Sequence, residues 1–439
     1  MGASWVSPAP FHGLNFCATK PMIPDTTDTE LLHGERMPGV SREEGALTDA
    51  CNRIRAALSI AATTAVLAAC STQFGGAPTT PQPDAQIAAN AAAVGDGQVV
   101  VAVVLPLSAQ GNAAVAAQSM KNAAEMALAE FKNANVRLLV KDDGGTPQGA
   151  QAAAQQAIAE GAEIIIGPLF AQSVSAAGQA ARASNIPVVA FSTDTNVASR
   201  GVYLLSFLPE SDVRRIVDFA ITRGKRSFAA LLPDNAYGAV VEAAFQQEVS
   251  RRGGRVLVLE KYPLDANRMT EAVRRVSQAA NQIDCIFIPD GADAVPQVVQ
   301  ALAANGVNLK RVQLLGTGLW DDPRVFSSAA LEDGWFAAPE AAGFRNFSSR
   351  YRARYGQDPV RTATLAYDAV ALVAALVKTQ GPQRFNEQVL ANPSGFTGID
   401  GVFRFRADGA NDRGLAVMRV TPSGGQVVSP APHSFQSGI

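Results

Sequence analysis

The three histidines of the chain, His12, His33 and His433, all lie in terminal segments that do not look folded. Serine–histidine and cysteine–histidine nucleophile pairs need an imidazole inside the core, and so do histidine-rich zinc sites. The part of the chain that looks folded therefore offers no histidine for such chemistry.

Paired carboxylates and a short glycine turn are the other residues that could do chemistry. Asp142-Asp143 and Asp321-Asp322 are adjacent in sequence, and adjacent side chains on a strand point to opposite faces, so acid–base pairing is not expected. Gly316-Thr317-Gly318 lacks the third glycine and the helix start of a dinucleotide-binding loop, so it is interpreted as a turn. We expect no catalytic residue, no metal site and no cofactor, and a protein that is not an enzyme.

Non-covalent binding is the chemistry that the remaining polar residues favour. Hydroxyl and amide side chains follow the carboxyl ends of expected strands, where the first turns of helices also present free backbone amides. Such a set would hold a carboxylate in one cleft, although each side chain could equally cap its own helix. The residues concerned are Ser108, Gln172, Ser173, Ser192, Thr193 and Asp194.

The elements that position these residues alternate along the chain from residue 98 onward. The 439 residues are 47% hydrophobic and only 7% aromatic, which together with abundant alanine favours packed helices. Short apolar runs bounded by turn residues predict parallel strands, and the amphipathic stripes between them predict helices that cover a sheet. The expected strands are 99–105, 136–140, 163–166, 187–190, 228–232, 255–259, 285–288 and 313–315.

Eight parallel strands could close into one barrel or divide into two open sheets, and the order of elements favours two sheets. After Leu204–Phe207, the next group of elements starts with a helix at Pro209 and not with a strand, which indicates that the chain crosses to another lobe there. Later helices over 344–355 and 362–378, and a hairpin over 401–420, predict three crossings in all. The expected fold class is α/β, with two Rossmann-like lobes whose parallel sheets are joined by a three-strand hinge. Lobe 1 comprises residues 98–210 and 341–396, and lobe 2 comprises residues 211–340 and 397–425.

Residues 53–70 have the features of a bacterial secretion signal. Two arginines precede an uncharged apolar run from Ala56 to Ala69, which is shorter than the ~20 residues of a membrane-spanning helix. The run ends in Leu67-Ala68-Ala69-Cys70, which resembles a lipobox and makes Cys70 the expected lipidation site. We expect residues 1–69 to be a leader and signal peptide, 70–97 a flexible tether, and 426–439 a disordered tail.

Charges and cysteines narrow the possible partners. Residues 1–69 hold five Lys and Arg and seven Asp and Glu, which leaves 32 of each sign in the remainder. Because the chain after residue 69 has no net positive charge to attract a phosphate backbone, no nucleic acid is expected as a partner. Cys285 stands alone in an apolar run, so we expect a small buried hydrophobe and no disulfide.

Five short segments, in their order and spacing, resemble the leucine/isoleucine/valine-binding family of type I periplasmic binding proteins. The resemblance extends from about residue 99 to residue 420. It implies two Rossmann-like lobes that hinge shut on an amino acid or related solute and feed an ABC transporter without chemistry. The segments are Val104-Leu105-Pro106-Leu107-Ser108, Asp142-Asp143, Ile166-Gly167-Pro168-Leu169, Ile186-Pro187-Val188-Val189 and Asn235-Ala236-Tyr237-Gly238.

The resemblance also implies ligand contacts from the second lobe. Tyr237 stands where the family presents an aromatic residue that covers the solute. Thr317 belongs to the segment beyond a strand where the family has an acidic residue for the ligand ammonium, but Gly318 occupies that place here. A desolvated ammonium needs a paired charge. The acidic residues that could supply this charge instead are Asp194, Asp290 and Asp293.

Two functions fit this interpretation. The first is a solute-binding protein of an ABC transporter, lipid-anchored in the periplasm to the inner or outer membrane, which binds an amino acid or similar small polar or carboxylate ligand. The alternative is a penicillin-binding-protein activator, a lipoprotein of the same fold whose partner would be a peptidoglycan synthase. A response of the purified protein to small ligands would favour the first function. Capture of a synthase without a ligand response would favour the second.

Overall fold

The first sheet forms from the valine- and isoleucine-rich runs before residue 205. In the computed structural model, which describes residues 93–263 and 266–435, all seven residues of the central strand β2 are buried. Strands β2 to β6 are parallel, and β1 pairs with β3 in the antiparallel direction. Across the sheet the strands are β1 Ala93–Val94, β3 Val136–Asp142, β2 Val99–Leu105, β4 Ile164–Ile166, β5 Val188–Ala190 and β6 Val202–Leu204.

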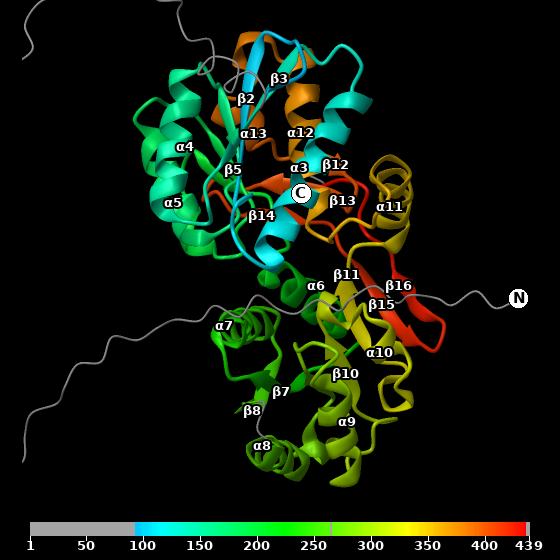
Figure 1. Ribbon diagram of the computed structural model, residues 1–439. Coiled ribbons are helices and arrows are strands. Elements are labelled where there is room, and N and C mark those ends of the chain that lie inside the picture. The colour runs from blue at the N-terminus through cyan, green and yellow to red at the C-terminus, as the bar shows by residue number, and fades with distance from the viewer. Residues whose placement is uncertain (1–92, 264–265, 436–439) are drawn as a thin grey trace, which may run out of the picture. The chain divides into compact units, whose positions relative to one another are not determined.

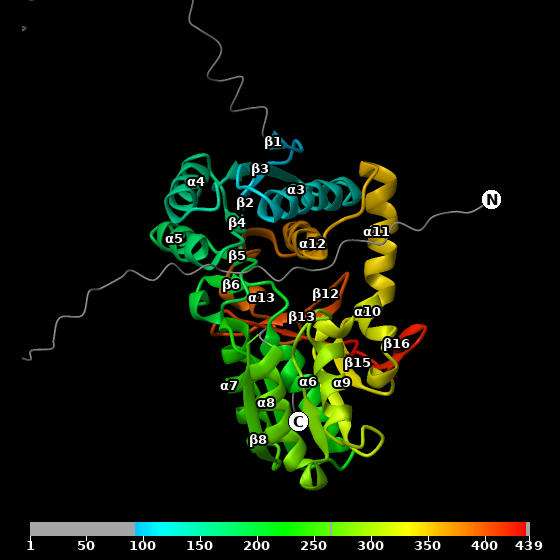
Figure 2. The ribbon, with the colours of Figure 1, turned by 60° about the horizontal axis from the view of Figure 1, so that its bottom comes forward.

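Helices cover both faces of this sheet, because successive side chains of β2 point to opposite faces and all of them are apolar. The helices are α3 Asn112–Glu130, α4 Pro147–Ala159, α5 Ala171–Arg182 and α12 Ala363–Thr379. Val101 and Val103 belong to a core that also contains residues of α3 and α12. Ala102 and Val104 pack in the opposite layer with α4 and α5. Figure 2 shows the two helix pairs on opposite sides of the sheet.

The second sheet repeats this plan with strands from the middle of the chain. Five strands are parallel, while β15 and β16 join the sheet in the antiparallel direction beyond β11. Their order is β16 Gly424–Ser429, β15 Ala416–Thr421, β11 Trp335–Ala338, β10 Gln313–Gly316, β9 Cys285–Phe287, β7 Ser227–Pro233 and β8 Arg255–Tyr262.

Helices again cover both faces of the second sheet. Phe228 and Leu232 of β7 pack with α6 and α7, and the alternate residue Leu231 packs with α8 and α9. Cys285 is buried in the first of these layers and forms no disulfide, and burial raises the pKa of its thiol. The helices of this lobe are α6 Pro209–Thr222, α7 Ala236–Arg251, α8 Ala266–Gln278, α9 Val295–Ala304 and the short α10 Pro323–Phe326.

The remaining elements form a small third sheet and helices of the first lobe. Phe403 and Phe405 of the third sheet lie in the same core as the α3 face of β2, and the rings of Phe405 and Tyr203 are 5.2 Å apart. Helix α11 contacts α3, where Asn122 donates a hydrogen bond to the hydroxyl of Tyr351 at 3.0 Å. These elements are β12 Phe396–Gly398, β13 Gly401–Phe405, β14 Asn411–Arg413, α11 Ala341–Tyr355 and α13 Glu387–Leu390. Short 3-10 turns occur in both lobes, at Thr195–Val197, Ala280–Gln282, Gly318–Trp320, Ala329–Leu331 and Gly381–Gln383.

Three connections join the two lobes, at residues 205–208, 339–340 and 414–415 (Figure 1). The first and third are tied together, because the carbonyl of Ser206 accepts hydrogen bonds from Asn411 Nδ2 at 3.0 Å and from Arg413 Nε at 2.9 Å. The guanidinium of Arg215 also donates to the carbonyl of Leu415 at 2.7 Å. The predicted fold class, α/β with two parallel-sheet lobes, is confirmed.

The segment 397–425, which the sequence places in lobe 2, divides in the structure. Its first part, β12 to β14, completes the first-lobe core because Phe403 and Phe405 face that core, whereas β15 adds to the second sheet. Two outer segments also contain regular structure: residues 93–94 of the expected tether form β1, and residues 426–429 of the expected tail belong to β16.

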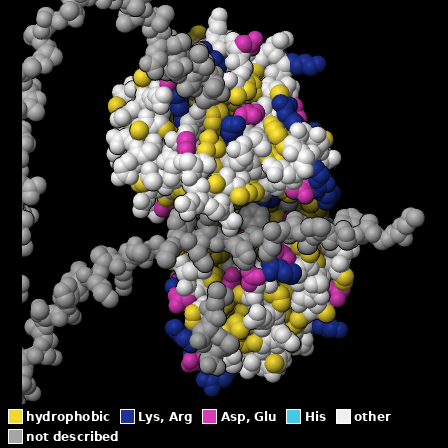
Figure 3. Space-filling model, in the orientation of Figure 1, with side chains coloured by type: hydrophobic (Ala, Val, Ile, Leu, Met, Phe, Trp, Pro, Cys, Tyr) yellow, Lys and Arg dark blue, Asp and Glu magenta, His cyan; other side chains and the backbone are white. Residues whose placement is uncertain are grey.

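The leader and the expected lipidation site Cys70 lie outside the described residues. Within the described ranges, no helix combines the length and the apolar character that a membrane crossing requires. On the face of the molecule in Figure 3, basic and acidic side chains are interspersed and do not gather by sign.

Candidate ligand-binding site

Four polar side chains gather at one edge of the second sheet, and we call them the second-lobe polar group: Tyr237, Tyr262, Asp290 and Thr317. Strands β10, β9, β7 and β8 are consecutive neighbours and run parallel, so their carboxyl ends share one edge. Thr317 follows β10, Asp290 follows β9, Tyr237 lies in the first turn of the helix after β7, and Tyr262 is the last residue of β8.

Hydrogen bonds join this group in pairs. The hydroxyl of Tyr237 lies 3.2 Å from Oγ1 of Thr317, which is fully buried. The hydroxyl of Tyr262 donates to Oδ2 of Asp290 at 2.7 Å, and Oδ1 of Asp290 accepts from the amide of Gly291 at 2.7 Å. These contacts fix both phenols at the sheet edge.

The electrostatics of the group follow from burial and from neighbouring carboxylates. Burial raises the pKa of Tyr237 and of Tyr262 far above the usual range, and the negative charge of Asp290 adds to both shifts. Burial also raises the pKa of Asp290, although the bonds from Tyr262 and Gly291 oppose this. Both tyrosines are therefore protonated at neutral pH and can donate a hydrogen bond.

The start of α7 explains how Tyr237 is held. Asn235 caps the helix, because its Oδ1 accepts a hydrogen bond from the amide of Gly238 at 2.8 Å. The cap fixes the first turn, so the side chain of the half-buried Tyr237 is directed to Thr317. The motif Asn235-Ala236-Tyr237-Gly238 thus holds the side chain of Tyr237 in place.

Asp212, in the first turn of α6, lies against this group. Its Oδ2 accepts a hydrogen bond from the amide of Gly318 at 2.8 Å. Burial raises the pKa of Asp212 to about 7, and the Gly318 bond and the charge of Arg413 oppose this shift. A Cβ atom on residue 318 would lie 3.3 Å from the same carboxylate oxygen, so the carboxylate occupies space that Gly318 leaves open.

The first-lobe residues follow strands of the first sheet, and one of them, Ser108, contacts Asp142 at the end of β3. Oδ1 of Asp142 accepts hydrogen bonds from the amides of Ser108 at 3.1 Å and Gly144 at 2.9 Å. Burial opposes ionisation of Asp142, but these bonds outweigh it and its pKa lies below the ordinary value. Ser108 itself is exposed at the end of the turn after β2.

The other first-lobe residues differ in solvent exposure and in whether their side chains are already hydrogen-bonded. Ser173 is fully buried, and within the described residues its hydroxyl has no hydrogen-bond partner. Gln172 and Thr193 are exposed and make no side-chain hydrogen bond in the described part of the chain. Ser192 Oγ accepts from the amide of Asp194 at 3.1 Å, and Asp194 Oδ1 accepts from the amide of Asn196 at 3.0 Å.

The structure therefore brings the predicted second-lobe residues together and places the predicted first-lobe residues after strands of the other sheet. Tyr237, Asp290 and Thr317 lie side by side, whereas Ser192 and Asp194 bond within their own turn. Among the described residues, no hydrogen bond joins the first-lobe group to the second-lobe group. The assignment of these residues to ligand binding stays a prediction.

Two polar residues beside the predicted group were missed in the sequence. Tyr262 was missed because the strand was expected to end at residue 259, whereas pairing with β7 continues to Pro233 and Tyr262. Asp212 was missed because it lies in a helix and not after a strand. The sequence signal that could have identified Asp212 is its position in the first turn of α6, directly after the connection between the lobes.

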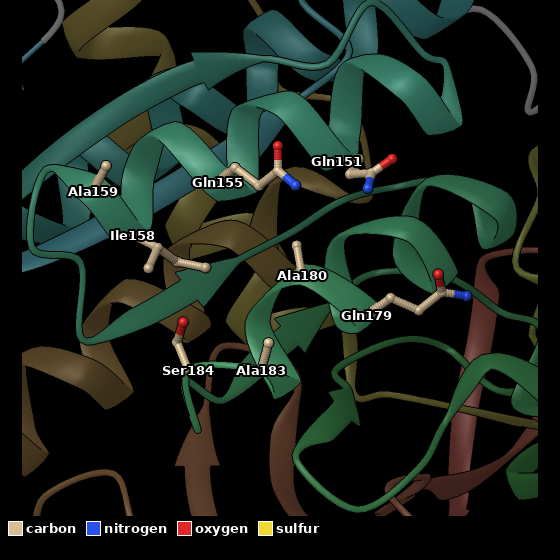
Figure 4. A pocket seen from close by; sticks show the side chains of 8 residues that line it. All are labelled: Gln151, Gln155, Ile158, Ala159, Gln179, Ala180, Ala183 and Ser184. Atoms are coloured by element: carbon tan, nitrogen blue, oxygen red, sulfur yellow. The ribbon is translucent and has the colours of Figure 1, made fainter.

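Two surface grooves in the described part of the chain lie apart from the predicted residues. A groove of about 470 Å³ lies between α4 and α5 (Figure 4), but it is lined by glutamine, alanine, serine and isoleucine side chains and none of the predicted residues belongs to it. A second groove, of about 490 Å³, lies beside α6 and α7 and likewise excludes them. Within residues 93–263 and 266–435, no group of three or more His, Cys, Asp or Glu side chains is placed to hold a metal ion.

Curated relatives of the chain are distant. A Leu/Ile/Val-binding protein homologue from Brucella melitensis is 24% identical over 229 residues, which is 50% of this chain and 58% of that protein. An uncharacterized protein from Rickettsia prowazekii is 24% identical over 187 residues, 43% of this chain and 49% of that one. The chain thus spans about half the length of the curated relatives it matches.

Solved structures share the fold over most of the chain. A branched-chain amino acid ABC transporter protein from Rhodospirillum rubrum is 21% identical, covers 75% of this chain and 99% of its own, and has a TM-score of 0.67. A solute-binding protein from Rhodopseudomonas palustris in complex with 3,4-dihydroxybenzoic acid is 20% identical, with coverages of 77% and 98% and a TM-score of 0.55. A protein from Streptococcus pneumoniae in complex with isoleucine is 17% identical, with coverages of 76% and 99% and a TM-score of 0.52.

The family model for periplasmic binding proteins matches residues 98–426. This range contains the three connections between the lobes, both groups of polar residues and both sheets except for β1 and the end of β16. The chain therefore belongs to the type I periplasmic binding protein family.

Proposed function

We propose that the protein is an extracytoplasmic solute-binding protein of an ABC transporter, which closes its two lobes on an amino acid or a similar small polar or carboxylate ligand. The observation that carries this proposal is the second-lobe polar group, in which hydroxyls and a carboxylate from four neighbouring strand ends converge. We expect first-lobe hydroxyls and backbone amides at the carboxyl edge of the other sheet to supply further contacts, because open α/β sheets bind ligands beyond the carboxyl ends of their strands.

The chemistry of the site supports binding and not covalent catalysis. Tyr237, Tyr262 and Thr317 supply hydroxyls that donate or accept hydrogen bonds, and neither phenol ionises at neutral pH. The fold neighbours include proteins in complex with isoleucine and with an aromatic carboxylic acid, so a small organic acid, with or without an amino group, is the substrate class that we propose. An ABC permease is the proposed partner, because the family feeds such transporters.

A ligand panel tests this proposal. The purified full-length chain is heated with amino acids, aliphatic and aromatic carboxylates, and short peptides, and at least one of them should raise the melting temperature, because a ligand that binds only the folded state stabilises it. The same ligand should raise the melting temperature of a Tyr237→Ala variant by less. An absence of any shift across the panel would contradict the proposed function.

Anchoring through Cys70 is a separate part of the proposal. The signal-like run before Cys70 and the polar segment after it are consistent with a lipoprotein tethered to a membrane surface. Intact mass spectrometry of the protein purified from membranes should show an N-terminus at Cys70 carrying a diacylglycerol mass. A Cys70→Ala variant should lack this mass and leave the membrane fraction.

A further inference from the structure

Residues 430–435, which follow β16, form a segment that we call the C-terminal strap. The strap begins on the second lobe, because the guanidinium of Arg215 in α6 donates to Oγ of Ser429 at 2.7 Å and to the carbonyl of Pro430 at 3.3 Å. The side chain of Ala431 packs against the core layer of this lobe that contains α8 and α9. The first two residues of the strap are therefore fixed to the lobe to which β16 belongs.

The far end of the strap lies on the first lobe. The guanidinium of Arg404 in β13 lies over the ring of Phe435, 4.7 Å from its centroid. A Cβ atom on Gly395, just before β12, would lie 2.8 Å from Cδ2 of Phe435, so the ring packs directly against the backbone there. Arg404 is itself held in place, since its Nε donates to Oδ2 of Asp412 at 3.0 Å. Phe435 is thus attached to a fixed side chain and to the backbone of the first lobe.

Between its two ends the strap crosses the connections between the lobes. The amide of Ala431 donates to Oε1 of Glu340, in the second connection, at 3.1 Å. A Cβ atom on Gly414, in the third connection, would lie 2.9 Å from Cγ of Pro432. The strap therefore contacts two of the three connections and adds a fourth link between the lobes, which ends in the contacts of Phe435.

Neither the sequence pattern nor the family accounts for this link. The sequence predicts a disordered tail over residues 426–439, and the family model ends at residue 426. The contacts of the strap are thus a feature of this chain beyond the residues that match the family.

We infer that the C-terminal strap restrains lobe rotations that move Arg215 away from Arg404, so that Phe435 must leave Arg404 and Gly395 before the lobes can rotate far in that direction. The six residues of the strap span at most about 20 Å when fully extended, so their reach is limited. A contact that one arrangement makes and another lacks favours the first arrangement by the free energy of that contact. The strap is therefore a conformational restraint at the hinge, and it does not depend on which ligand the protein binds.

Distances between the lobes, measured without ligand, test this inference. Spin labels are attached to the full-length chain at two exposed positions, through Gln155→Cys in α4 and Gln300→Cys in α9. The three cysteines before residue 71 are replaced by serine, and the buried Cys285 is retained. Double electron–electron resonance then gives the distribution of distances between the lobes. The variants are Phe435→Ala and a chain that ends at Ser429.

Phe385→Ala is the matched control for Phe435→Ala. The guanidinium of Arg384 lies 5.8 Å from the ring centroid of Phe385, and both residues belong to the first lobe. This substitution therefore removes the same kind of contact from within one lobe.

The full-length chain should give mainly one distance between the lobes. In Phe435→Ala and in the chain that ends at Ser429, the ratio of this distance to all others should fall roughly fivefold, because the arrangement loses a cation–π contact and the packing of one ring. Phe385→Ala should keep the distribution of the full-length chain.

An unchanged distribution after removal of residues 430–439 would overturn the inference, and so would a distribution for Phe435→Ala no broader than that for Phe385→Ala. If circular dichroism shows that the shortened chain does not fold, Phe435→Ala decides alone. Because the distances are measured without ligand, either negative result leaves the proposed function intact, and a ligand panel without any response leaves the role of the strap intact.

Discussion

Two neighbouring aspartates at the edge of the first sheet have opposite electrostatic environments. Asp142 accepts amide hydrogen bonds that hold its pKa below the ordinary value. Asp143 is only 1% exposed, one of its oxygens has no partner among the described residues, and burial raises its pKa to about 6. One residue therefore stabilises the fold when it is ionised, and the other destabilises it.

We predict that Asp143→Asn stabilises the protein at neutral pH more than at acidic pH. In the unfolded chain the carboxyl of Asp143 has the ordinary aspartate pKa of 3.8, whereas in the folded protein it ionises near pH 6, so stability is lost as the pH rises through this window. The penalty that asparagine removes is about 3 kcal/mol well above pH 6 and only about 0.5 kcal/mol at pH 4. Urea unfolding at pH 4 and at pH 7.5 measures it.

Asp142→Asn is the matched control, and its effect has the opposite sign. Because the folded pKa of Asp142 is lowered, its contribution to stability is present above the unfolded pKa and disappears as the pH falls through the folded value. Asp142→Asn should thus be destabilising at pH 7.5 and less so at low pH. Equal pH dependence of the two variants would contradict this interpretation of the pair.

At the residue scale, the sequence predicted the position of polar side chains better than their environment. Tyr237 and Thr317 were chosen from the family resemblance, and Asp290 as an acidic residue that could replace the missing ammonium partner. All three follow strands of the second sheet, and they do lie together. Asp194 follows a strand as well, but its carboxylate bonds to Asn196 in a local turn. Sequence pattern does not reveal such local bonds, nor the contribution of a helix residue such as Asp212, because both depend on how separate elements pack.

The link between β4 and α5 requires glycine at one position. Gly167 has φ +93°, and a Cβ there would lie 2.0 Å from the carbonyl oxygen of Val104 in the neighbouring strand. We predict that Gly167→Ala costs about 3 kcal/mol or more of unfolding free energy, because backbone strain adds to a clash with backbone atoms. Chemical denaturation measures this cost.

Gly161→Ala is the control for Gly167, since Gly161 has φ +88° and open space around its Cβ position. It should cost only about 1 kcal/mol from the left-handed backbone conformation. Similar costs for the two substitutions would show that the close approach to Val104 does not limit this turn.

A buried ion pair ties the start of α12 to the third sheet. Arg361 donates to both carboxylate oxygens of Asp400, at 2.9 and 2.6 Å, and the side chain of Asp400 is fully buried. The hydroxyl of Thr364 also donates to Asp400 at 2.6 Å. The pair therefore holds together segments that are about forty residues apart in sequence.

Asp400→Ala is predicted to destabilise the protein by about 3–5 kcal/mol, because it leaves the Arg361 guanidinium partly buried without its counter-ion. Asp358→Ala, which breaks the exposed pair with Arg352, should cost less than about 1 kcal/mol. Urea unfolding of both variants measures the difference. A loss no larger for Asp400→Ala than for Asp358→Ala would contradict the role of the buried pair.

At the element scale, the strands were predictable because each is a short apolar run between turn residues. The last segment was harder, because residues 401–420 alternate as one hairpin would, yet they serve two sheets. Phe403 and Phe405 are covered by the first-lobe core, and only residues beyond Gly414 pair with β11. Local periodicity indicates that a strand forms, but it does not indicate which sheet the strand joins.

At the scale of the whole molecule, each lobe has its own core on both faces of its own sheet, and three connections join the lobes. A ligand that contacts the polar groups of both lobes would stabilise the closed arrangement in proportion to its difference in affinity for the closed and open states. We predict that saturation with a ligand from the panel lowers the radius of gyration in small-angle X-ray scattering.

The Tyr237→Ala variant tests whether ligand contacts in the second lobe cause the lobes to close. The substitution removes a second-lobe contact, so it should weaken affinity by roughly tenfold or more and require a correspondingly higher ligand concentration for the same change in scattering. Without ligand, the variant and the wild-type chain should give the same scattering curve, because Tyr237 is only half-buried at the sheet edge. Identical curves for the wild-type chain with and without saturating ligand would mean that binding occurs without closure, and the hinge would then not be part of the function.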